Sequence, residues 1–368
     1  MTRESRARAL ALAAGFLMLG GAEAVLRLWS APFLTDQSGK FMRDVTAILR
    51  RDGELFWVQR GNLRKVFFGV PVVTDEFGLR NPAGYIARPG DKDEFRILVL
   101  GASSSFGWGV PEELTYPRRL EGLLRAGSSR PVRVMNASVI GYSSWQGLAL
   151  LKKYLAVFRP DYVIASFAIN DACRERFFYS GALPDKDSKA RGAGFLNFVN
   201  DLALTRAVAA LASRFRPRGL PPGGGTVRVS PQDFSDNHEA IVALARQRHA
   251  DAGFLIIPFH FPALPPANSR AAERLAIMRR MRDYESILHD LSRRDFVDIV
   301  DMSAPLGARY SDYFRLDKGD YIHPNIRGHA LIAQALARLL LPRLRRPSGP
   351  AAGGGRDRRG APAPRSGL

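Results

Sequence analysis

From Phe95 onward, short runs of apolar residues alternate with longer stretches of helical periodicity. The runs are rich in branched side chains and lack polar alternation, which is typical of strands buried on both faces. These runs are Ile97–Leu100, Val132–Met135, Tyr162–Phe167, Phe254–Ile257 and Val297–Val300. The helical stretches are Tyr116–Arg125, Ser144–Phe158, Pro231–Ala250, Arg270–Ser292 and a last one from about Pro324 to Leu341.

This alternation predicts an α/β protein, because strands separated by helices form a parallel sheet covered on both faces. We expect a flavodoxin-like, three-layer α/β/α sandwich with about five parallel strands. In such folds, ligands bind at the carboxyl ends of the strands. Side chains that directly follow the apolar runs are therefore the candidates for function.

Composition sets wide limits on the class of protein. The chain has 368 residues, of which 46% are hydrophobic and 24% charged, as in ordinary globular proteins. Its single cysteine, Cys173, excludes an internal disulfide and a zinc site built on paired cysteines. The net charge of +19 indicates either a general use of arginine at the surface or an anionic partner in the cell envelope.

The first thirty residues resemble an export segment. An apolar run from Ala9 to Gly21 continues to Trp29, interrupted by Glu23 and Arg27, and follows three basic residues, Arg3, Arg6 and Arg8. The run has about the ~20 residues of a spanning helix, and the basic flank keeps its amino end in the cytoplasm. We expect an uncleaved transmembrane anchor with the domain periplasmic or otherwise extracytoplasmic. Cleavage at Ala22-Glu23-Ala24 is the alternative. Export argues against a nucleic-acid partner.

The rest of the chain divides by composition. We expect a signal anchor over 1–30, a lead-in segment over 31–94 that packs on the main domain, and the main domain over 95–345. A long mixed stretch, 173–226, with a flexible Pro and Gly break, predicts an insertion over the site, such as a lid. The tail, 346–368, is rich in Pro, Gly, Arg and Ala and predicts disorder.

Two candidate segments follow the first two apolar runs. Ser103 lies in the turn after the first run, where a serine hydroxyl is exposed at the edge of the sheet. A helix N-cap would favour serine there as well. Gly141 lies in the loop after the second run, where a glycine lets the backbone approach a ligand. An ordinary turn explains a glycine equally well.

Two further segments complete the set. Asn170 follows the third run, and its amide can donate a hydrogen bond to an oxyanion, although an Asn turn is the alternative. Asp320 precedes His323 by three residues, just before the last helix. A carboxylate at that spacing can orient the imidazole and leave its other nitrogen free as a base. A surface histidine beside an unrelated aspartate has the same spacing.

In this order, the four segments resemble those of the SGNH hydrolases, also called GDSL esterases and lipases. That superfamily carries a G-D-S block, a glycine block, a G-x-N-D block and a D-x-x-H block. Ser103, Gly141, Asn170 and His323 fall into these places. The runs Ser105–Val110 and Asp75–Arg80 look like the corresponding segments of the superfamily's bacterial branch, whose members carry an N-terminal membrane anchor. The resemblance spans roughly Asp75 to Leu341.

The resemblance implies a serine esterase without metal or cofactor. Ser103 would be the nucleophile, His323 the base and Asp320 its partner, with an oxyanion hole made by the N–H groups of Ser103 and Gly141 and the amide of Asn170. The substrate would be an O-acetyl or short-chain ester on an envelope glycan or lipid. An O-acyltransferase acting on an envelope polysaccharide and an inactive carbohydrate-binding module on the same fold are the alternatives.

The chain departs from the superfamily at two positions. Ala102 replaces the usual aspartate before the nucleophile, and Ala168 stands where the third block usually has glycine. The aspartate is not the acid of the triad, so the resemblance still implies catalysis. Ser104 and Ser105 are rival nucleophiles, and the superfamily's frame selects Ser103.

Overall fold

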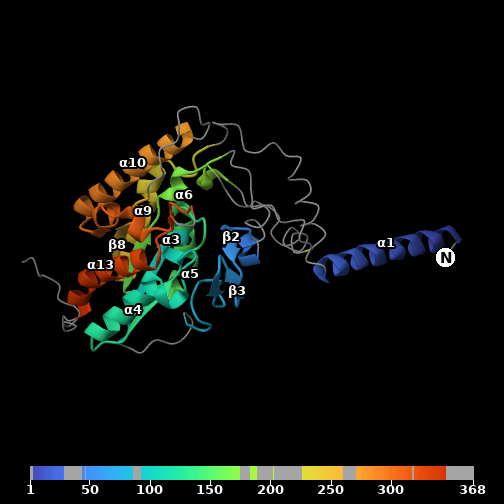
Figure 1. Ribbon diagram of the computed structural model, residues 1–368, viewed down its shortest axis with the longest axis horizontal. Helices are drawn as coiled ribbons and strands as arrows, with labels where there is room; N and C mark the ends of the chain where they lie inside the picture. Colours follow the sequence, from blue (N-terminus) through green and yellow to red (C-terminus); the bar gives the residue numbers. More distant parts are fainter. Residues whose placement is uncertain are drawn as a thin grey trace, which may run out of the picture.

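The protein is described by a computed structural model that covers residues 3–28, 44–45, 47–85, 93–174, 183–188, 202, 226–259, 271–316 and 319–344 (Figure 1). The insertion predicted over 173–226 and the tail predicted over 346–368 lie largely or wholly outside these residues. His260, another histidine after the fourth apolar run, lies outside them too.

The centre of the molecule is a five-stranded sheet in the order β6-β5-β7-β8-β9. Every neighbouring pair in it is parallel. The strands are β5 (Phe95–Gly101), β6 (Val132–Asn136), β7 (Tyr162–Ser166), β8 (Asp251–Ile256) and β9 (Asp298–Asp301). The predicted parallel sheet is confirmed, and each strand lies within three residues of its predicted start.

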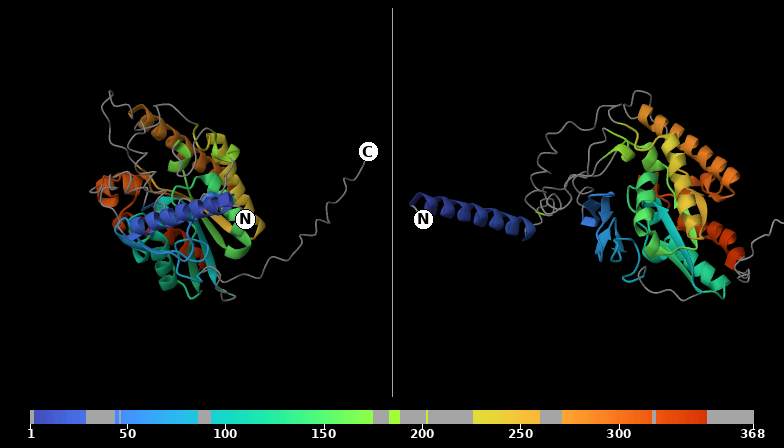
Figure 2. Two further views of the ribbon diagram at one scale, coloured as in Figure 1. Left: turned by 90° about the vertical axis from the view of Figure 1, so that its right-hand side faces the viewer. Right: turned by 180° about the vertical axis from the view of Figure 1, so that it is seen from behind.

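Helices cover both faces of the sheet, as the two views of Figure 2 show. On β5, Ile97 and Val99 face one apolar cluster, and Leu98 and Leu100 face the other. This alternation explains why the strand is apolar at every position. The first cluster includes residues of α4 (Tyr116–Gly127) and α13 (Ile326–Leu344), and the second those of α5 (Ser144–Phe158), α9 (Pro231–Gln247) and α10 (Ala271–Asp295). The predicted three-layer sandwich is confirmed.

The last helix starts two residues later than predicted, at Ile326. The side chain of Asn325 accepts hydrogen bonds from the N–H groups of Arg327 and Gly328, at 2.9 and 3.1 Å. Asn325 is therefore the N-cap. Pro324 lies outside the helix, in a bridge to Phe314.

The segment before the sheet forms two antiparallel pairs, which Figure 1 shows beside the main body. One pair joins β1 (Leu49–Asp52) to β2 (Phe56–Gln59), and the other joins β3 (Arg64–Phe67) to β4 (Val70–Val73). Trp57 and Phe67 are buried in the same apolar cluster as α5 and the sheet. The short elements of the described chain are α3 (Ser103–Phe106), η2 (Glu112–Leu114), α6 (Ile169–Ala172), η3 (Asp185–Asp187), α11 (Ser303–Gly307) and α12 (Tyr310–Tyr313).

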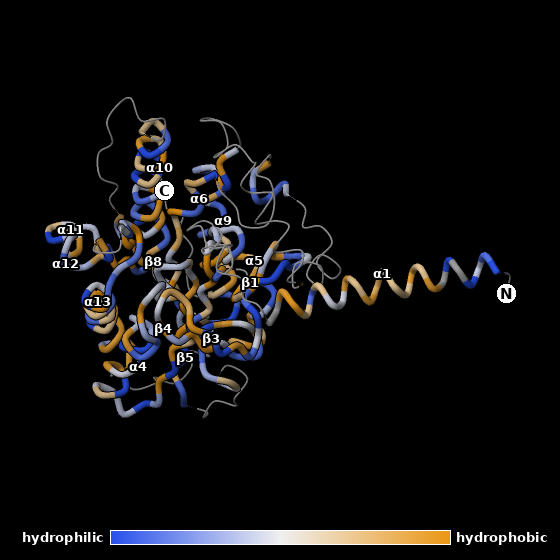
Figure 3. Tube along the Cα trace, turned by 45° about the vertical axis from the view of Figure 1, so that its right-hand side comes forward, coloured by the Kyte–Doolittle hydropathy of each residue, from blue (hydrophilic) through white to orange (hydrophobic). Residues whose placement is uncertain are grey.

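The amino-terminal helix, α1 (Arg3–Leu28), is long and apolar enough to cross a membrane. Its apolar stretch is not buried against the rest of the protein, and Figure 3 shows a hydrophobic rod with a hydrophilic amino end. A signal sequence has the same length and composition. The helix is therefore a candidate membrane segment or signal sequence.

Candidate active site

The sheet order brings three of the predicted segments to one edge. β5 lies between β6 and β7, so the chain reverses its direction of winding at β5. Such switch points leave a crevice at the carboxyl ends of the strands. Ser103 follows β5, Gly141 lies in the loop after β6, and Asn170 is the second residue of α6, which follows β7.

Ser103 opens the four-residue helix α3 directly beyond β5. The turn before it is tight, because a Cβ on Gly101 would lie 2.5 Å from Ser105 Oγ. Ser103 Oγ lies 2.8 Å from His323 Nε2. Ser104 Oγ lies 3.5 Å from the carbonyl oxygen of Ile322 instead, and Ser105 is fully buried. Of the three neighbouring serines, Ser103 is therefore the one whose hydroxyl lies against the imidazole.

Asp320 and His323 lie in the loop before α13. His323 Nδ1 lies 2.8 and 3.0 Å from the two carboxylate oxygens of Asp320. The same carboxylate accepts the N–H groups of Ile322 and His323, each at 3.1 Å. Burial raises the pKa of Asp320, but its hydrogen bonds, the one to the His323 ring first, outweigh burial and hold that pKa below its ordinary value. An ionised Asp320 assigns the proton to Nδ1, so Nε2 accepts the Ser103 hydroxyl.

Trp108 fixes the imidazole from its face. The Trp108 and His323 rings are stacked, with centroids 4.9 Å apart and planes 8° apart. Trp108 in turn packs on Phe67 and Phe68 of the β3–β4 pair, with centroids at 4.8 and 4.5 Å. Its carbonyl oxygen accepts a hydrogen bond from Arg315 at 2.9 Å. Trp108 was only part of a motif in the sequence, and nothing there indicated that it contacts His323.

Three hydrogen-bond donors lie at this edge of the sheet: the N–H groups of Ser103 and Gly141 and the side-chain amide of Asn170. Gly141 has a φ of 79°, a backbone conformation that favours glycine. Among the described residues, neither the Gly141 N–H nor the Ser103 N–H has an acceptor. Asn170 Nδ2 donates to the carbonyl oxygen of Tyr142 at 2.9 Å, and its second amide hydrogen has no acceptor in the part of the chain that the structure describes. These groups are the donors that the resemblance assigns to an oxyanion hole.

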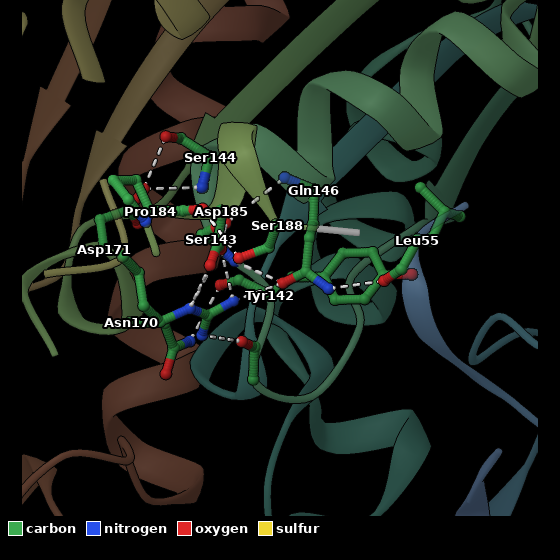
Figure 4. A network of polar contacts seen from close by, with 12 residues as sticks. Leu55, Tyr142, Ser143, Ser144, Gln146, Asn170, Asp171, Pro184, Asp185 and Ser188 are labelled. Carbon is green, nitrogen blue, oxygen red and sulfur yellow. Dashed lines mark hydrogen bonds and ion pairs between the residues drawn. The ribbon is translucent and has the colours of Figure 1, made fainter. Parts of the chain in front are cut away.

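A buried polar network supports these donors (Figure 4). Arg228 donates to the carbonyl oxygen of Gly141 at 2.7 Å and pairs with Asp185 at 2.9 Å. Asp185 accepts the hydroxyl of Ser143, the N-cap of α5, at 2.7 Å. All of these side chains are buried, where a single unpaired charge would be costly. The ion pair of Arg228 with Asp185 avoids that cost, because each charge compensates the other. The network ties η3 to the glycine loop.

Asp171, next to Asn170, belongs to the same network. Its carboxylate accepts the N–H of Ser144 at 2.8 Å and the hydroxyl of Ser144 at 2.5 Å. Burial raises the pKa of Asp171 to about 7. Asp171 thus joins the asparagine turn to the first residue of α5.

Ala168, the second departure from the superfamily, has a φ of 155°. A non-glycine residue in that region costs on the order of 1–3 kcal/mol. The turn is closed by a 3.0 Å hydrogen bond from the N–H of Ala172 to the carbonyl of Ala168. The glycine usual in this block therefore has a conformational reason, and this chain carries strain beside Asn170.

A hollow of about 380 Å³, which includes open solvent at its mouth, adjoins the serine. Its walls are mostly apolar: Ala102, Ser104, Ser166, Phe167, Ala168, Ile169, Ile257, Phe259, Met281 and Ile322. Ala102 replaces an aspartate of the superfamily, so this part of the wall is apolar here. Among the described residues, no three His, Cys, Asp or Glu side chains gather to hold a metal ion.

Residues 99–331, more than half of the chain, match the GDSL-like Lipase/Acylhydrolase family. An arylesterase of Vibrio mimicus is 38% identical over 80 residues, which cover 22% of this chain and 39% of that protein. The protein in the crystal structure of TesA is 18% identical to this chain, with a TM-score of 0.43. The match covers 67% of this chain and 98% of the TesA chain. The psychrotrophic esterase EstA from Pseudoalteromonas sp. is 16% identical to this chain, with a TM-score of 0.42. The match covers 69% of this chain and 100% of the EstA chain.

The chain belongs to the GDSL-like lipase/acylhydrolase family, within the SGNH superfamily that the motifs predicted. Lipases and acylhydrolases, enzymes that hydrolyse esters, give this family its description.

Proposed function

We propose that this enzyme is a membrane-anchored serine esterase of the cell envelope with Ser103 as nucleophile. The observation that supports it best is the hydrogen-bonded line from Ser103 Oγ through the His323 ring to Asp320. Its two distances, both 2.8 Å, are within the range for a nucleophile, its base and the group that orients the base.

The mechanism follows from these positions. His323 Nε2 takes the proton of Ser103 Oγ as that oxygen attacks the ester carbonyl. The resulting oxyanion receives hydrogen bonds from the N–H groups of Ser103 and Gly141 and from Asn170, each worth about 3 kcal/mol or near a hundred-fold in rate. The imidazolium then protonates the departing alcohol. Water, deprotonated by His323, then attacks the acyl-Ser103 ester, and His323 returns that proton to Ser103 Oγ as the bond to the acyl group breaks and the acid leaves.

The hollow beside Ser103 supports a small acyl group. It adjoins Ser103 through the two residues that flank the serine, Ala102 and Ser104. Apolar side chains such as Phe167, Ile257 and Met281 suit an acetyl or short alkyl chain and offer no charge for an ionic group. We therefore propose O-acetyl or short-chain esters, carried by an envelope glycan or lipid, as substrates.

The site of action follows from α1. Its basic amino end (Arg3, Arg6, Arg8) would stay in the cytoplasm, and the chain after it would lie outside the membrane. In this proposal residues 1–30 are the anchor and 95–345 the catalytic domain, with 31–94 as a lead-in packed on it. An acetylated glycan or lipid outside the membrane would then be within its reach.

The test is turnover of p-nitrophenyl acetate by the purified full-length protein in detergent. We expect turnover by the wild type and background rates for Ser103→Ala and His323→Ala. His289→Ala is the matched control, because His289 also pairs with an aspartate, Asp301 at 2.9 Å, which lies on the outer strand β9, three strands away from β5. A folded wild type as inert as Ser103→Ala would contradict esterase activity. Transfer of the acyl group to an added glycan would then identify the O-acyltransferase alternative.

A further inference from the structure

The loop that carries Gly141 is held by a side chain from outside the matched family region. Trp57, in β2, donates its indole N–H to the carbonyl oxygen of Ile140 at 2.9 Å. The matched region begins only at residue 99. The lead-in strand therefore reaches the backbone of the glycine loop directly.

This hydrogen bond acts on the peptide unit that contains the oxyanion donor. The carbonyl of Ile140 and the N–H of Gly141 belong to one peptide bond, which is planar and trans, so the two groups point in opposite directions. A donor that fixes the Ile140 oxygen therefore fixes the direction of the Gly141 N–H. That N–H has no acceptor among the described residues.

Trp57 is itself immobilised. It is 0% exposed, and its own carbonyl oxygen accepts the hydroxyl of Tyr142 at 2.8 Å. The Tyr142 ring packs edge-on against the indole, with centroids 6.0 Å apart. The guanidinium of Arg228 lies 5.4 Å from the indole centroid. The indole is thus held in place by Tyr142, which follows Gly141 in the loop, and by Arg228.

The next two carbonyls of the loop are held by side chains from the matched region. Arg228 donates to Gly141 and Asn170 to Tyr142, at 2.7 and 2.9 Å. The peptide that presents the oxyanion donor depends on Trp57 instead. We propose that Trp57 is a positioning residue for catalysis, which aims the Gly141 N–H at the oxyanion. This inference rests on the proposed function.

A purely structural Trp57 makes a different prediction. Loss of a buried donor would then lower stability and leave the rate per folded molecule unchanged. A positioning role instead lowers kcat, because the Gly141 N–H strengthens its bond only as charge develops on the ester oxygen. KM would change little, since the ground-state ester carries no such charge. The split between kcat and KM separates the two roles.

The experiment compares Trp57→Phe with wild type and Tyr162→Phe in the full-length protein, using p-nitrophenyl acetate. Tyr162→Phe also deletes one buried donor, to Asp298 at 2.7 Å, but near the start of β7 at the opposite end of the sheet. We expect Trp57→Phe to lower kcat about 10-fold, less than the near hundred-fold loss expected for a whole oxyanion donor, with KM within about twofold. Tyr162→Phe should keep the wild-type kcat.

A second variant removes the N–H without removing the ring. Site-specific incorporation of 3-benzothienylalanine at position 57 keeps the bicyclic shape and replaces the N–H by sulfur. It should show the same fall in kcat, and it decides the matter if Trp57→Phe does not fold. Wild-type kcat in this folded variant, or a rise in KM alone, would overturn the positioning role and leave the esterase intact. A wild type without turnover would overturn the esterase first, and the positioning role with it.

Discussion

At the scale of single residues, the carboxylate of Asp320 has two tasks. It orients the imidazole of His323, and it accepts a backbone N–H of its own loop. Asp320→Asn keeps the shape but can present an amide N–H to His323, which favours the wrong tautomer. We expect kcat for p-nitrophenyl acetate to fall by about 10⁴-fold with KM little changed. Asp301→Asn, beside His289, is the control. A loss under tenfold in Asp320→Asn would contradict the assigned role.

The sequence located the residues with short-range signatures. Asp320 and His323 are three residues apart, and Ser103 and Asn170 come shortly after strands, so their positions could be read from spacing and order. Trp108 and Trp57 could not be found this way. Their partners, His323 and Ile140, lie far away in the chain, and an aromatic residue in a loop has no pattern that distinguishes stacking on a base from ordinary burial.

At the scale of elements, α13 and α4 are joined by a buried histidine. His329 of α13 is 0% exposed, and its Nδ1 accepts the N–H of Tyr116, the first residue of α4, at 3.0 Å. Burial first, and the positive charge of Arg80 next, lower the pKa of His329 to about 3. The neutral ring is therefore part of the folded state.

This pKa makes stability depend on pH. The unfolded chain binds a proton at His329 near the ordinary histidine pKa of about 6.5, and the folded chain does not. The contribution of His329 to the free energy of unfolding is therefore present above that pH and is lost as the pH falls below it. In urea unfolding between pH 6 and 4, we expect wild type to lose up to about 1.4 kcal/mol per pH unit more than His329→Asn. The Asn variant keeps an acceptor and cannot bind the proton. Parallel curves would contradict this account.

The element boundaries show what periodicity can and cannot predict. The helix over 144–158 was predicted to the residue from its apolar spacing, and in the structure Ser143 caps its start. The start of α13 was predicted at Pro324, because proline is common in a first turn, whereas Asn325 caps the helix. The pairing of β1 with β2 was not predicted, since its four-residue strands include charged positions and carry little alternation.

At the scale of the whole molecule, α1 decides where the enzyme acts. If α1 is an uncleaved anchor, the full-length protein will stay in the membrane fraction after alkaline carbonate extraction and will retain its first residues by mass spectrometry. We expect a variant lacking residues 1–28 to leave that fraction. A soluble mature protein that begins near Val25 would contradict anchoring and identify Ala22-Glu23-Ala24 as a cleavage site.

The lead-in and the main domain form one apolar core. Residues of β2 and β3 share the cluster that contains α5 and one face of the sheet. The candidate active site therefore depends on both segments. Ser103 and His323 come from the main domain, and the aromatic residues behind Trp108 and the glycine loop come from the lead-in.

The central claim is that Ser103 is the nucleophile, and covalent labelling tests it most directly. The full-length protein would be treated with a fluorophosphonate, digested with trypsin and analysed by mass spectrometry, beside Ser103→Ala. We predict one adduct, in the peptide Ile97–Arg118, with fragment ions that place it on Ser103 and no adduct in the variant. An adduct on Ser104 or Ser105, or equal labelling of Ser103→Ala, would contradict the claim.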